Sequence, residues 1–374
     1  MRIAVAVSGG VDSLCALLLL QRAGHEVMAL HALLAEPSPA SASPLPGLEA
    51  ACRTLGVPLR VVDLRARFAR EVVTPFAAAY AEGRTPNPCA LCNRHIKFGA
   101  LLDVSLELGA ERLATGHYAR IVGGTRAGAP GPLLARATHA PKDQSYFLSL
   151  VPRERLGRVL FPLADMDKAA CAALVAEGGL AVPVPQESHD ICFAPGGVDA
   201  YREFLEQKWQ ALGITPPGPG PVLLREEAAG LEEGCGACPA GAPLRQIGSH
   251  AGLWRYTEGQ RRGLGFAHTE ALHVLHKDVA ANALVVGPRR LLGMRALLAG
   301  EVNVAVDPRF WPERPLVRCR YGGGLSAASA QLEGNRLSLS FAEACFPTAA
   351  GQVATLYDEE GVVLAGAVVE EVLA

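Results

Sequence analysis

The sequence predicts an α/β protein whose first part is a doubly wound parallel sheet and whose last part is rich in β-strands. Apolar runs alternate with helical patterns over roughly the first 205 residues, and the first run ends in a Gly-rich loop that opens a helix. Beyond residue 270 the apolar residues recur with a period of two, which is typical of strands. The β-rich part is therefore expected to form a small barrel or sandwich.

In the first part, each expected strand is a short apolar run bounded by turn residues. We expect strands at residues 3–7, 27–33, 59–64 and 112–115. We expect helices at residues 13–23, around 51–55, at 98–108 and, as several segments, from 145 to about 178. Strands that alternate with helices indicate crossover connections and hence a parallel sheet.

A change in composition separates the two parts. Residues 216–243 are rich in Gly and Pro and contain Cys235 and Cys238, which indicates a linker or an insertion. Strands are expected after it at residues 271–275, 284–287 and 337–341, and within 353–362 around a turn at 358–361.

Length and composition limit the class of protein. A chain of 374 residues is expected to divide into two or three domains. It lacks an uninterrupted apolar run of the ~20 residues that a membrane span needs, so we expect a cytoplasmic protein without a membrane partner. Its 10 cysteines are irregularly spaced and are expected to be reduced.

Charge gives no overall attraction to nucleic acid, because the formal net charge is −2. An RNA-binding surface would have to be built from local clusters of Lys and Arg. Such clusters occur at residues 84–97, 255–262 and 309–320.

The loop Ser8-Gly9-Gly10-Val11-Asp12-Ser13 lies between the first strand and the first helix. Consecutive backbone N–H groups and the helix N-terminus suit such a loop to a phosphate chain. It lacks the Lys of the Walker A pattern and instead matches the PP-loop, SGGxDS, of enzymes that split ATP between the α and β phosphates. A full match at the first strand favours this function over an ordinary turn. Asp12 would place Mg²⁺ or the nucleotide, and Ser8 and Ser13 would bind phosphate oxygens.

Two further segments carry thiols. Cys89 and Cys92 lie near Arg94 and Lys97, whose positive charge favours a thiolate. The alternative for these two thiols is half of a zinc site completed by Cys235 and Cys238. Cys192 follows polar neighbours in Glu187-Ser188-His189-Asp190; a lone Cys is more often a packing residue, and these neighbours favour chemistry.

Several motifs occur together and in a fixed order: the PP-loop, TPNPCALCNRHIKFG, ATGHYAR, KDQSYFL, ESHDICF and YTEGQRRGLG. With them the chain resembles the bacterial tRNA-specific 2-thiouridylases, which thiolate the wobble uridine of certain tRNAs. The motifs extend from residue 1 to about 275, and weaker matches at 320–321 and 347–352 continue to the end. The resemblance implies a PP-loop domain at 1–205, a small central domain at 206–285 and a C-terminal β-barrel at 286–374.

The resemblance also implies roles for individual residues. Cys92 would be the nucleophile, Cys192 the persulfide carrier and Asp12 a further catalytic residue. The nucleotide would be bound by Ala6, Val7, Ser8, Gly9, Gly10, Val11, Asp12, Ser13, Ala32 and Gly116. The tRNA would be contacted by Asn87, Pro88 and Cys89 at the target base, and elsewhere by His117, Lys142, Asp143, Gln144, Arg320, Tyr321 and Gln352.

The implied reaction needs ATP and Mg²⁺ and explains two separate thiols. ATP would convert the uridine 2-carbonyl oxygen into an adenylate, which leaves as AMP. A persulfide sulfur on Cys192 would attack that carbon, or Cys92 would release it as sulfide and form a Cys92–Cys192 disulfide. The expected partners are tRNAs of the Lys, Glu and Gln types and a cysteine desulfurase or sulfur relay protein that donates the persulfide.

The chain departs from the family pattern in three places. Residues 35–46 lack the usual aromatic and acidic side chains, His189 replaces a Gln, and residues 226–243 look like an insertion. Two other functions are considered: a PP-loop enzyme with a different acceptor, and a tRNA-binding protein without catalysis. Cys192 disfavours a PP-loop ligase with a different acceptor, because a ligase has no need of a paired thiol. The intact PP-loop and the presence of both cysteines disfavour a tRNA-binding protein without catalysis.

Overall fold

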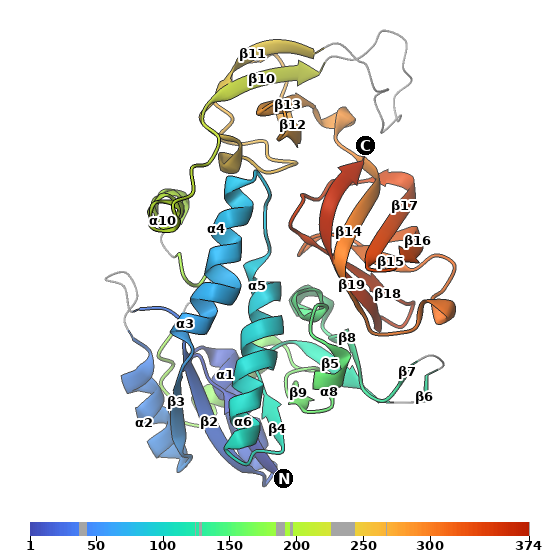
Figure 1. Cartoon of the computed structure of the whole chain (residues 1–374). Helices are drawn as coiled ribbons and strands as arrows, with labels where there is room; N and C mark the ends of the chain where they lie inside the picture. The colour runs from blue at the N-terminus through green and yellow to red at the C-terminus, as the bar shows by residue number, and fades with distance from the viewer. Residues whose placement is uncertain are drawn as a thin grey trace.

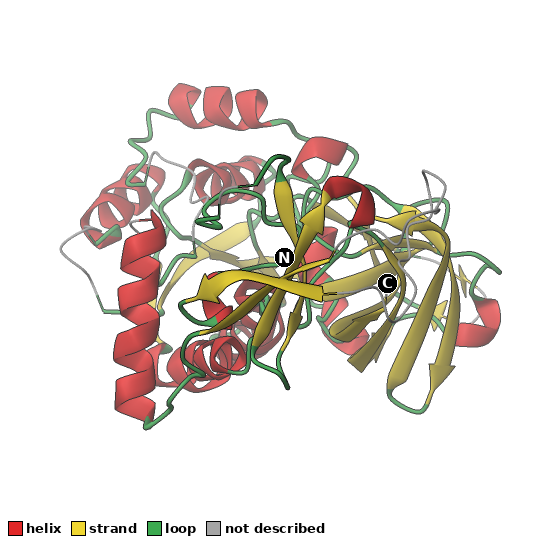
Figure 2. Ribbon diagram, turned by 90° about the horizontal axis from the view of Figure 1, so that it is seen from above, coloured by secondary structure: helices red, strands yellow, loops and turns green. Residues whose placement is uncertain are grey.

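The computed structural model describes residues 1–36, 43–123, 125–126, 129–184, 191–194, 197–225, 244–266 and 268–373. Its three parts lie around a pair of long helices (Figure 1). The N-terminal parallel sheet lies at one end of this pair, a small sheet at the other end, and the C-terminal barrel at its side. Figure 2 shows the same arrangement from above, with helices gathered around the first sheet and strands in the C-terminal part.

The N-terminal sheet is parallel and doubly wound, which confirms the predicted fold class. Its strand order is β3-β2-β1-β4-β9, and every pair of neighbours is parallel. The strands are β1 (Arg2–Ala6), β2 (Glu26–Leu33), β3 (Leu59–Asp63), β4 (Arg112–Ala114) and β9 (Val159–Leu160). The prediction of helical segments alone from 145 to 178 was wrong at β9, whose short apolar run pairs with β4.

Helices cover both faces of this sheet. On one face, Ile3 and Val5 pack with residues of α1 (Val11–Arg22), α2 (Leu45–Leu55) and α9 (Lys168–Glu177). On the other face, Ala4 and Leu30 pack with Phe68, Ile96 and Phe98 of the long helices. The inner strands β1, β2 and β4 are thus largely buried on both sides, as their continuous apolar runs require, whereas the edge strand β3 is partly exposed.

The two long helices form an antiparallel pair. The first consists of α3 (Arg65–Phe68), η1 (Ala69–Val73) and α4 (Thr74–Ala81), and the second of α5 (Pro88–Leu91), η2 (Cys92–Leu101) and α6 (Leu102–Glu107). The segments η1 and η2 have π-type hydrogen bonding, whereas the later η segments are 3-10 turns. The helix expected at 98–108 begins earlier, at Pro88, because the Asn87 side chain accepts a hydrogen bond from Ala90 N at 3.1 Å and Pro88 suits the first turn.

Between β4 and α9 the chain reaches the C-terminal barrel. This stretch contains β5 (Ala119–Val122), β6 (Thr125–Arg126), β7 (Ala129–Pro130), β8 (Leu133–Arg136), η3 (Ala140–Lys142), α7 (Ser145–Leu148) and α8 (Arg153–Leu156). Leu133 belongs to the apolar core of the barrel, and Ala135 forms a bridge with Val362. The first and last parts of the chain therefore share one core.

The central part is a four-stranded sheet of order β11-β10-β13-β12. Its elements are α10 (Gly197–Leu212), β10 (Gly220–Arg225), β11 (Leu244–His250), η4 (Leu253–Arg255), β12 (Leu272–Asp278) and β13 (Ala283–Pro288). The expected boundaries at 205 and 285 fall inside α10 and β13. Helix α10 joins the central part to α4, since Leu205 and Trp209 pack with Phe76, Ala77 and Trp254.

The C-terminal part is a closed barrel of order β14-β17-β16-β15-β18-β19, so a barrel and not a sandwich is confirmed. Its elements are η5 (Arg289–Leu291), β14 (Met294–Val304), η6 (Pro308–Phe310), β15 (Leu316–Arg318), β16 (Ser326–Glu333), β17 (Arg336–Cys345), β18 (Val353–Tyr357) and β19 (Val363–Leu373). The expected turn at 358–361 is present, with Gly361 at φ +79°.

Within the described ranges, no helix combines the length and the apolar character that crossing a membrane requires.

Asp143 joins the N-terminal part to the barrel. Its carboxylate is fully buried and accepts hydrogen bonds from Ala137 N at 3.1 Å and from Ser145 N at 3.1 Å. From the barrel, Arg318 Nη1 donates to Asp143 Oδ2 at 2.8 Å. A buried charge pair with these extra hydrogen bonds fixes the relative orientation of the two parts.

We predict that Asp143→Ala lowers the free energy of unfolding by about 3–5 kcal/mol, because Arg318 would be left buried without its partner. Urea denaturation of the full chain measures this change. The matched control is Asp307→Ala, since Asp307 pairs with an Arg309 side chain that is 82% exposed; loss of its hydrogen bond to Arg309 N should cost far less than the change at Asp143. Equal stability of the two variants would contradict the role given to Asp143.

Candidate active site

The candidate site lies where the strand order of the first sheet reverses. The chain leaves β1 toward β2 and β3 on one side, and β4 and β9 lie on the other side. Open α/β sheets bind ligands outside the carboxyl ends of the strands at such a point. The loop after β1 and residues 115–117 after β4 meet there, and Ala32 lies near the end of β2, the other neighbour of β1.

The phosphate loop is held by its own hydroxyl groups. Ser13 Oγ accepts a hydrogen bond from Ser8 N at 3.2 Å and donates one to Gly10 O at 2.9 Å. Gly9 has φ +91°, a conformation that a side chain disfavours. Helix α1 starts at Val11, directly after the loop, so its free N–H groups open at this point.

Gly116 lies against the backbone of this loop. A Cβ atom at Gly116 would come within 2.8 Å of Asp12 C and 2.9 Å of Ser13 N. These are backbone atoms, which cannot move aside as a side chain can. Glycine is thus required for the close approach of β4 to the start of α1, and the structure brings Gly116 to the nucleotide-loop residues as expected.

Asp12 is held by two residues that the sequence analysis did not assign. Lys168 Nζ at the start of α9 donates to both carboxylate oxygens, at 3.0 and 2.9 Å, and Tyr118 Oη donates to Asp12 Oδ1 at 2.8 Å. Tyr118 lies within the ATGHYAR motif, so the sequence did indicate that this segment belongs to the site. Lys168 is distant in sequence, and no local pattern indicates its contact.

Three thiols from two segments influence one another. Cys89 and Cys192 are exposed, whereas Cys92 is buried. Burial raises the pKa of Cys92 to about 12, and negative charge on Cys192 or Cys89 raises it too. Although Cys192 and Cys89 keep some contact with solvent, desolvation by the protein atoms around them raises their pKa as well, and the charge of Lys97 opposes this in all three thiols. Phe193, the residue after Cys192, packs against the apolar cluster that contains Cys92, so the segments of the nucleophile and persulfide-carrier candidates lie together in the fold.

His117 adjoins this cluster. Its Nε2 lies 3.3 Å from Lys97 Nζ, and its Nδ1 lies 2.8 Å from Thr115 Oγ1. Desolvation and the Lys97 charge lower the pKa of His117 well below its usual value, so the ring is neutral.

The residues assigned to tRNA contacts fall into two groups. Cys89, Arg320 and Tyr321 are exposed. Others make internal hydrogen bonds: Asn87 caps α5, Gln144 Oε1 accepts from Tyr118 N at 3.0 Å, and Gln352 Nε2 donates to Thr85 O at 2.8 Å. Pro88 and Asp143 are buried, and Lys142 is half-buried. Contact of each of these residues with tRNA remains a prediction.

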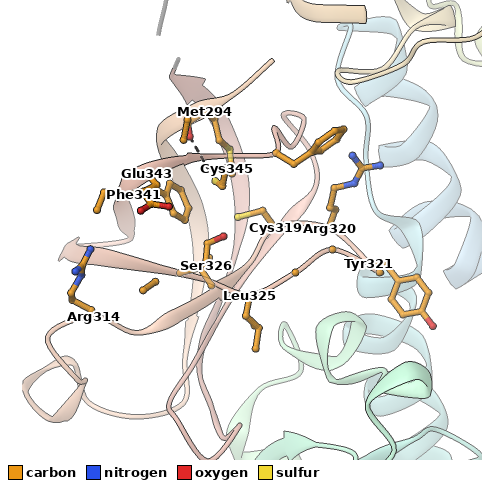
Figure 3. Close-up of a pocket in the computed structure, with 18 residues that line it drawn as sticks. Met294, Arg314, Cys319, Arg320, Tyr321, Leu325, Ser326, Phe341, Glu343 and Cys345 are labelled. Carbon is orange, nitrogen blue, oxygen red and sulfur yellow. Dashed lines mark hydrogen bonds between the residues drawn. The ribbon is translucent and has the colours of Figure 1, made fainter. Parts of the chain in front are cut away.

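A cavity of about 860 Å³ opens in the barrel beside Arg320 and Tyr321 (Figure 3). Tyr321 projects from its edge, with its ring centroid 4.6 Å from that of Phe147 in the N-terminal part. Arg320 lies over the exposed ring of Phe346 at 4.8 Å. Exposed aromatic and guanidinium groups of this kind can stack on nucleic-acid bases.

No three His, Cys, Asp or Glu side chains are grouped to hold a metal ion in the part of the chain that the structure describes. The possible zinc pair Cys235 and Cys238 lies outside the described residues, as do Glu187, Ser188, His189 and Asp190 of the segment before Cys192. The zinc interpretation of Cys89 and Cys92 thus remains untested.

Comparison with known proteins identifies the family. Residues 1–196 match the tRNA methyl transferase HUP domain, 241–288 the tRNA methyl transferase PRC-barrel domain and 294–369 the aminomethyltransferase beta-barrel domain. The tRNA-specific 2-thiouridylase MnmA of Oleidesulfovibrio alaskensis is 44% identical over 100% of both chains. The chain belongs to the tRNA-specific 2-thiouridylase family.

Other members of the 2-thiouridylase family are also similar to this chain over nearly its whole length. That of Nitratidesulfovibrio vulgaris strain Miyazaki F is 45% identical over 99% of both chains, and that of Roseiflexus castenholzii is 37% identical over 98% of both. Among solved structures, a complex of a 4-thiouridine synthetase with RNA and bound ATP is 17% identical and covers 57% of this chain and 51% of that one. Its TM-score of 0.32 is too low to support an argument.

We predict that Gly116→Ala weakens ATP binding at least about tenfold, since the new Cβ would displace the backbone at Asp12 and Ser13. Isothermal titration calorimetry with ATP and Mg²⁺ measures the change. Gly123→Ala is the control, because nothing lies within 4 Å of a Cβ there. If both variants bound ATP as the wild type does, the close contact at Gly116 would not matter for the nucleotide.

Proposed function

We propose that this protein is a tRNA uridine 2-sulfurtransferase, which replaces the 2-oxygen of the wobble uridine with sulfur and converts ATP to AMP and pyrophosphate. The observation that carries this proposal is that adjacent residues join the PP-loop to the thiol-bearing helix, in a chain similar over its full length to the 2-thiouridylases: Gly116 lies against Asp12 and Ser13, and His117 Nε2 lies 3.3 Å from Lys97 Nζ. Neither feature alone would suffice, because the loop indicates only ATP cleavage and the thiols only sulfur or redox chemistry.

The nucleotide would occupy the loop after β1. Backbone N–H groups of residues 9–13 and the start of α1 suit the phosphates, and Gly116 leaves room for the backbones to approach. Lys168, which binds the Asp12 carboxylate, adds positive charge beside the loop. We propose that Mg²⁺ arrives with ATP, since Mg²⁺ usually takes few protein ligands together with substrate phosphates, and Asp12 is the carboxylate at hand.

The uridine would lie between this loop and the thiols. Its 2-carbonyl oxygen attacks the α-phosphate, pyrophosphate leaves, and the resulting adenylate turns a poor leaving group into AMP. In one route the terminal sulfur of a Cys192 persulfide adds to C2 and AMP leaves; Cys92 then attacks the Cys192 sulfur, which frees the 2-thiouridine and forms a Cys92–Cys192 disulfide. In the other route Cys92 first attacks the Cys192 sulfur of the persulfide, which frees sulfide and forms the same disulfide, and the sulfide then displaces AMP from C2. Cys92 and Cys192 are free thiols in the structure, and a thiol reductant would have to return the disulfide to this state before the next turnover.

The tRNA would approach from the side of the barrel. Arg320 and Tyr321 are exposed there, and Cys89 is the exposed member of the segment assigned to the target base. A loop base costs little to extrude from its stack and can reach such a site. We propose tRNAs of the Lys, Glu and Gln types as substrates, a cysteine desulfurase or sulfur relay protein as the donor, and the cytoplasm as the place where they meet.

The test is nucleoside analysis of tRNA from cells that lack this protein, complemented with variants of it. We predict that wobble 2-thiouridine is absent, is restored by the wild type, and is reduced at least about a hundredfold with Cys92→Ser or Cys192→Ser. Cys52→Ser, a change at a buried thiol of α2, is the matched control and should restore the nucleoside.

Two results would overturn the proposal. One is unchanged 2-thiouridine in cells that lack this protein and any backup enzyme. The other is full complementation by both the Cys92→Ser and the Cys192→Ser variants. In purified form, both variants should still release pyrophosphate in the presence of tRNA, because the thiols act after adenylation.

A further inference from the structure

One helix places two thiols and a lysine on the same side. Cys89 and Cys92 are three residues apart, a spacing that brings side chains to one face. The helix then has π-type hydrogen bonding over Cys92–Leu101, in which each carbonyl pairs with the amide five residues on. Lys97, five residues after Cys92, therefore returns to the face that carries the thiols.

The Lys97 side chain is held by His117 from the end of β4. Lys97 Nζ lies 3.3 Å from His117 Nε2, and because an ammonium group can only donate, Nε2 must be the acceptor. The ring proton is then on Nδ1, which donates to Thr115 Oγ1 at 2.8 Å. The ring is packed beside Phe98 and Phe161, at centroid distances of 5.8 and 6.1 Å, so it has a fixed orientation.

The other charged groups of this helix turn point elsewhere. Arg94 Nη1 pairs with Glu301 of the barrel at 3.3 Å. Burial and the charge of Arg94 lower the pKa of His95, and the charge of Glu71 opposes them. Lys97 has His117 as its hydrogen-bond partner, and Phe193 beside Cys192 packs against the cluster that contains Cys92. The charge of Lys97 lowers the pKa of Cys89, Cys92 and Cys192, against the larger effect of burial, which raises it.

We infer that Lys97 is the residue that stabilises the sulfur anions of the transfer reaction, and that His117 positions its ammonium group. A thiol loses its proton to solvent, the Lys97 ammonium keeps its own protons, and the sulfur anion pairs with that ammonium. The same group can pair in turn with the anion on Cys192, on Cys92 or on a persulfide. This inference rests on the proposed sulfur transfer and assigns the group that offsets part of the cost of forming a sulfur anion at this buried site.

The test is the pH dependence of thiol alkylation in the full-length protein without tRNA. Iodoacetamide labels Cys89 and Cys192, which are exposed, and mass spectrometry of the peptides gives the rate at each thiol. With Lys97→Met, the midpoint pH of labelling should rise by about one unit, so that labelling at pH 7.5 is about tenfold slower. Lys97→Arg should keep most of the wild-type rate.

The matched control is Arg94→Met, which removes a cation from the same helix turn without changing the partner of the thiols. Its labelling profile should equal that of the wild type. An unchanged profile in Lys97→Met, or an equal shift in Arg94→Met, would overturn the inference. If Lys97→Met unfolds, the buried Cys15 and Cys52 become labelled; His117→Gln then carries the test, with a smaller rise in the midpoint expected and an unchanged midpoint contradicting the inference.

This experiment separates the inference from the proposed function. Labelling of thiols needs no tRNA, ATP or sulfur donor, so the profiles report on Lys97 even if the reaction is a different one. Conversely, if the wild type formed no 2-thiouridine while Lys97→Met shifted the profile as expected, the proposed function would fail and the role of Lys97 toward the thiols would stand.

Discussion

The hydrogen bonding of residues 85–88 is the constraint on which the active site depends. Two hydrogen bonds join Thr85 to the C-terminal part: Thr85 N donates to Ala350 O at 2.7 Å, and Gln352 Nε2 donates to Thr85 O at 2.8 Å. From the central part, Lys277 Nζ donates to Thr85 Oγ1 at 3.1 Å. All three parts of the chain thus meet at the segment that begins the thiol-bearing helix.

This arrangement explains why an enzyme of this kind needs two additional domains. Asn87 caps the helix from within the fixed segment, so the position of Cys89 and Cys92 depends on contacts from outside the first sheet. Lys277 is almost fully buried, and burial lowers its pKa, while Glu258 at 3.5 Å opposes that effect. A charge held in the interior in this way fixes one geometry at the cost of desolvation.

Much of the fold could be predicted from local patterns. The apolar runs at β1, β2, β3 and β4 are visible in the sequence because a strand inside a parallel sheet needs apolar side chains on both faces, and β17 shows a period of two because only one of its faces is buried. The phosphate loop was also predictable, since its function is carried by contiguous backbone groups. β9 was missed because a two-residue strand shows no period of its own.

The site was harder to predict, because its contacts join distant residues. Lys168 and Asp12 are 156 residues apart, and nothing in either segment indicates that they pair. Similarity of motif assigned Asp143 and Gln352 to the tRNA surface, whereas their side chains make internal hydrogen bonds that link the domains. Motifs show which residues matter to a family and do not by themselves distinguish contact with substrate from support of the fold.

We propose that the loop after β1 activates the same base that the thiols attack. The most direct test of this coupling uses tRNA in which the wobble uridine carries ¹⁸O at C2, incubated with the protein, ATP and a persulfide donor. We expect one ¹⁸O atom in AMP for each 2-thiouridine formed. Recovery of the label in water, or formation of 2-thiouridine with ADP and phosphate as products, would contradict it.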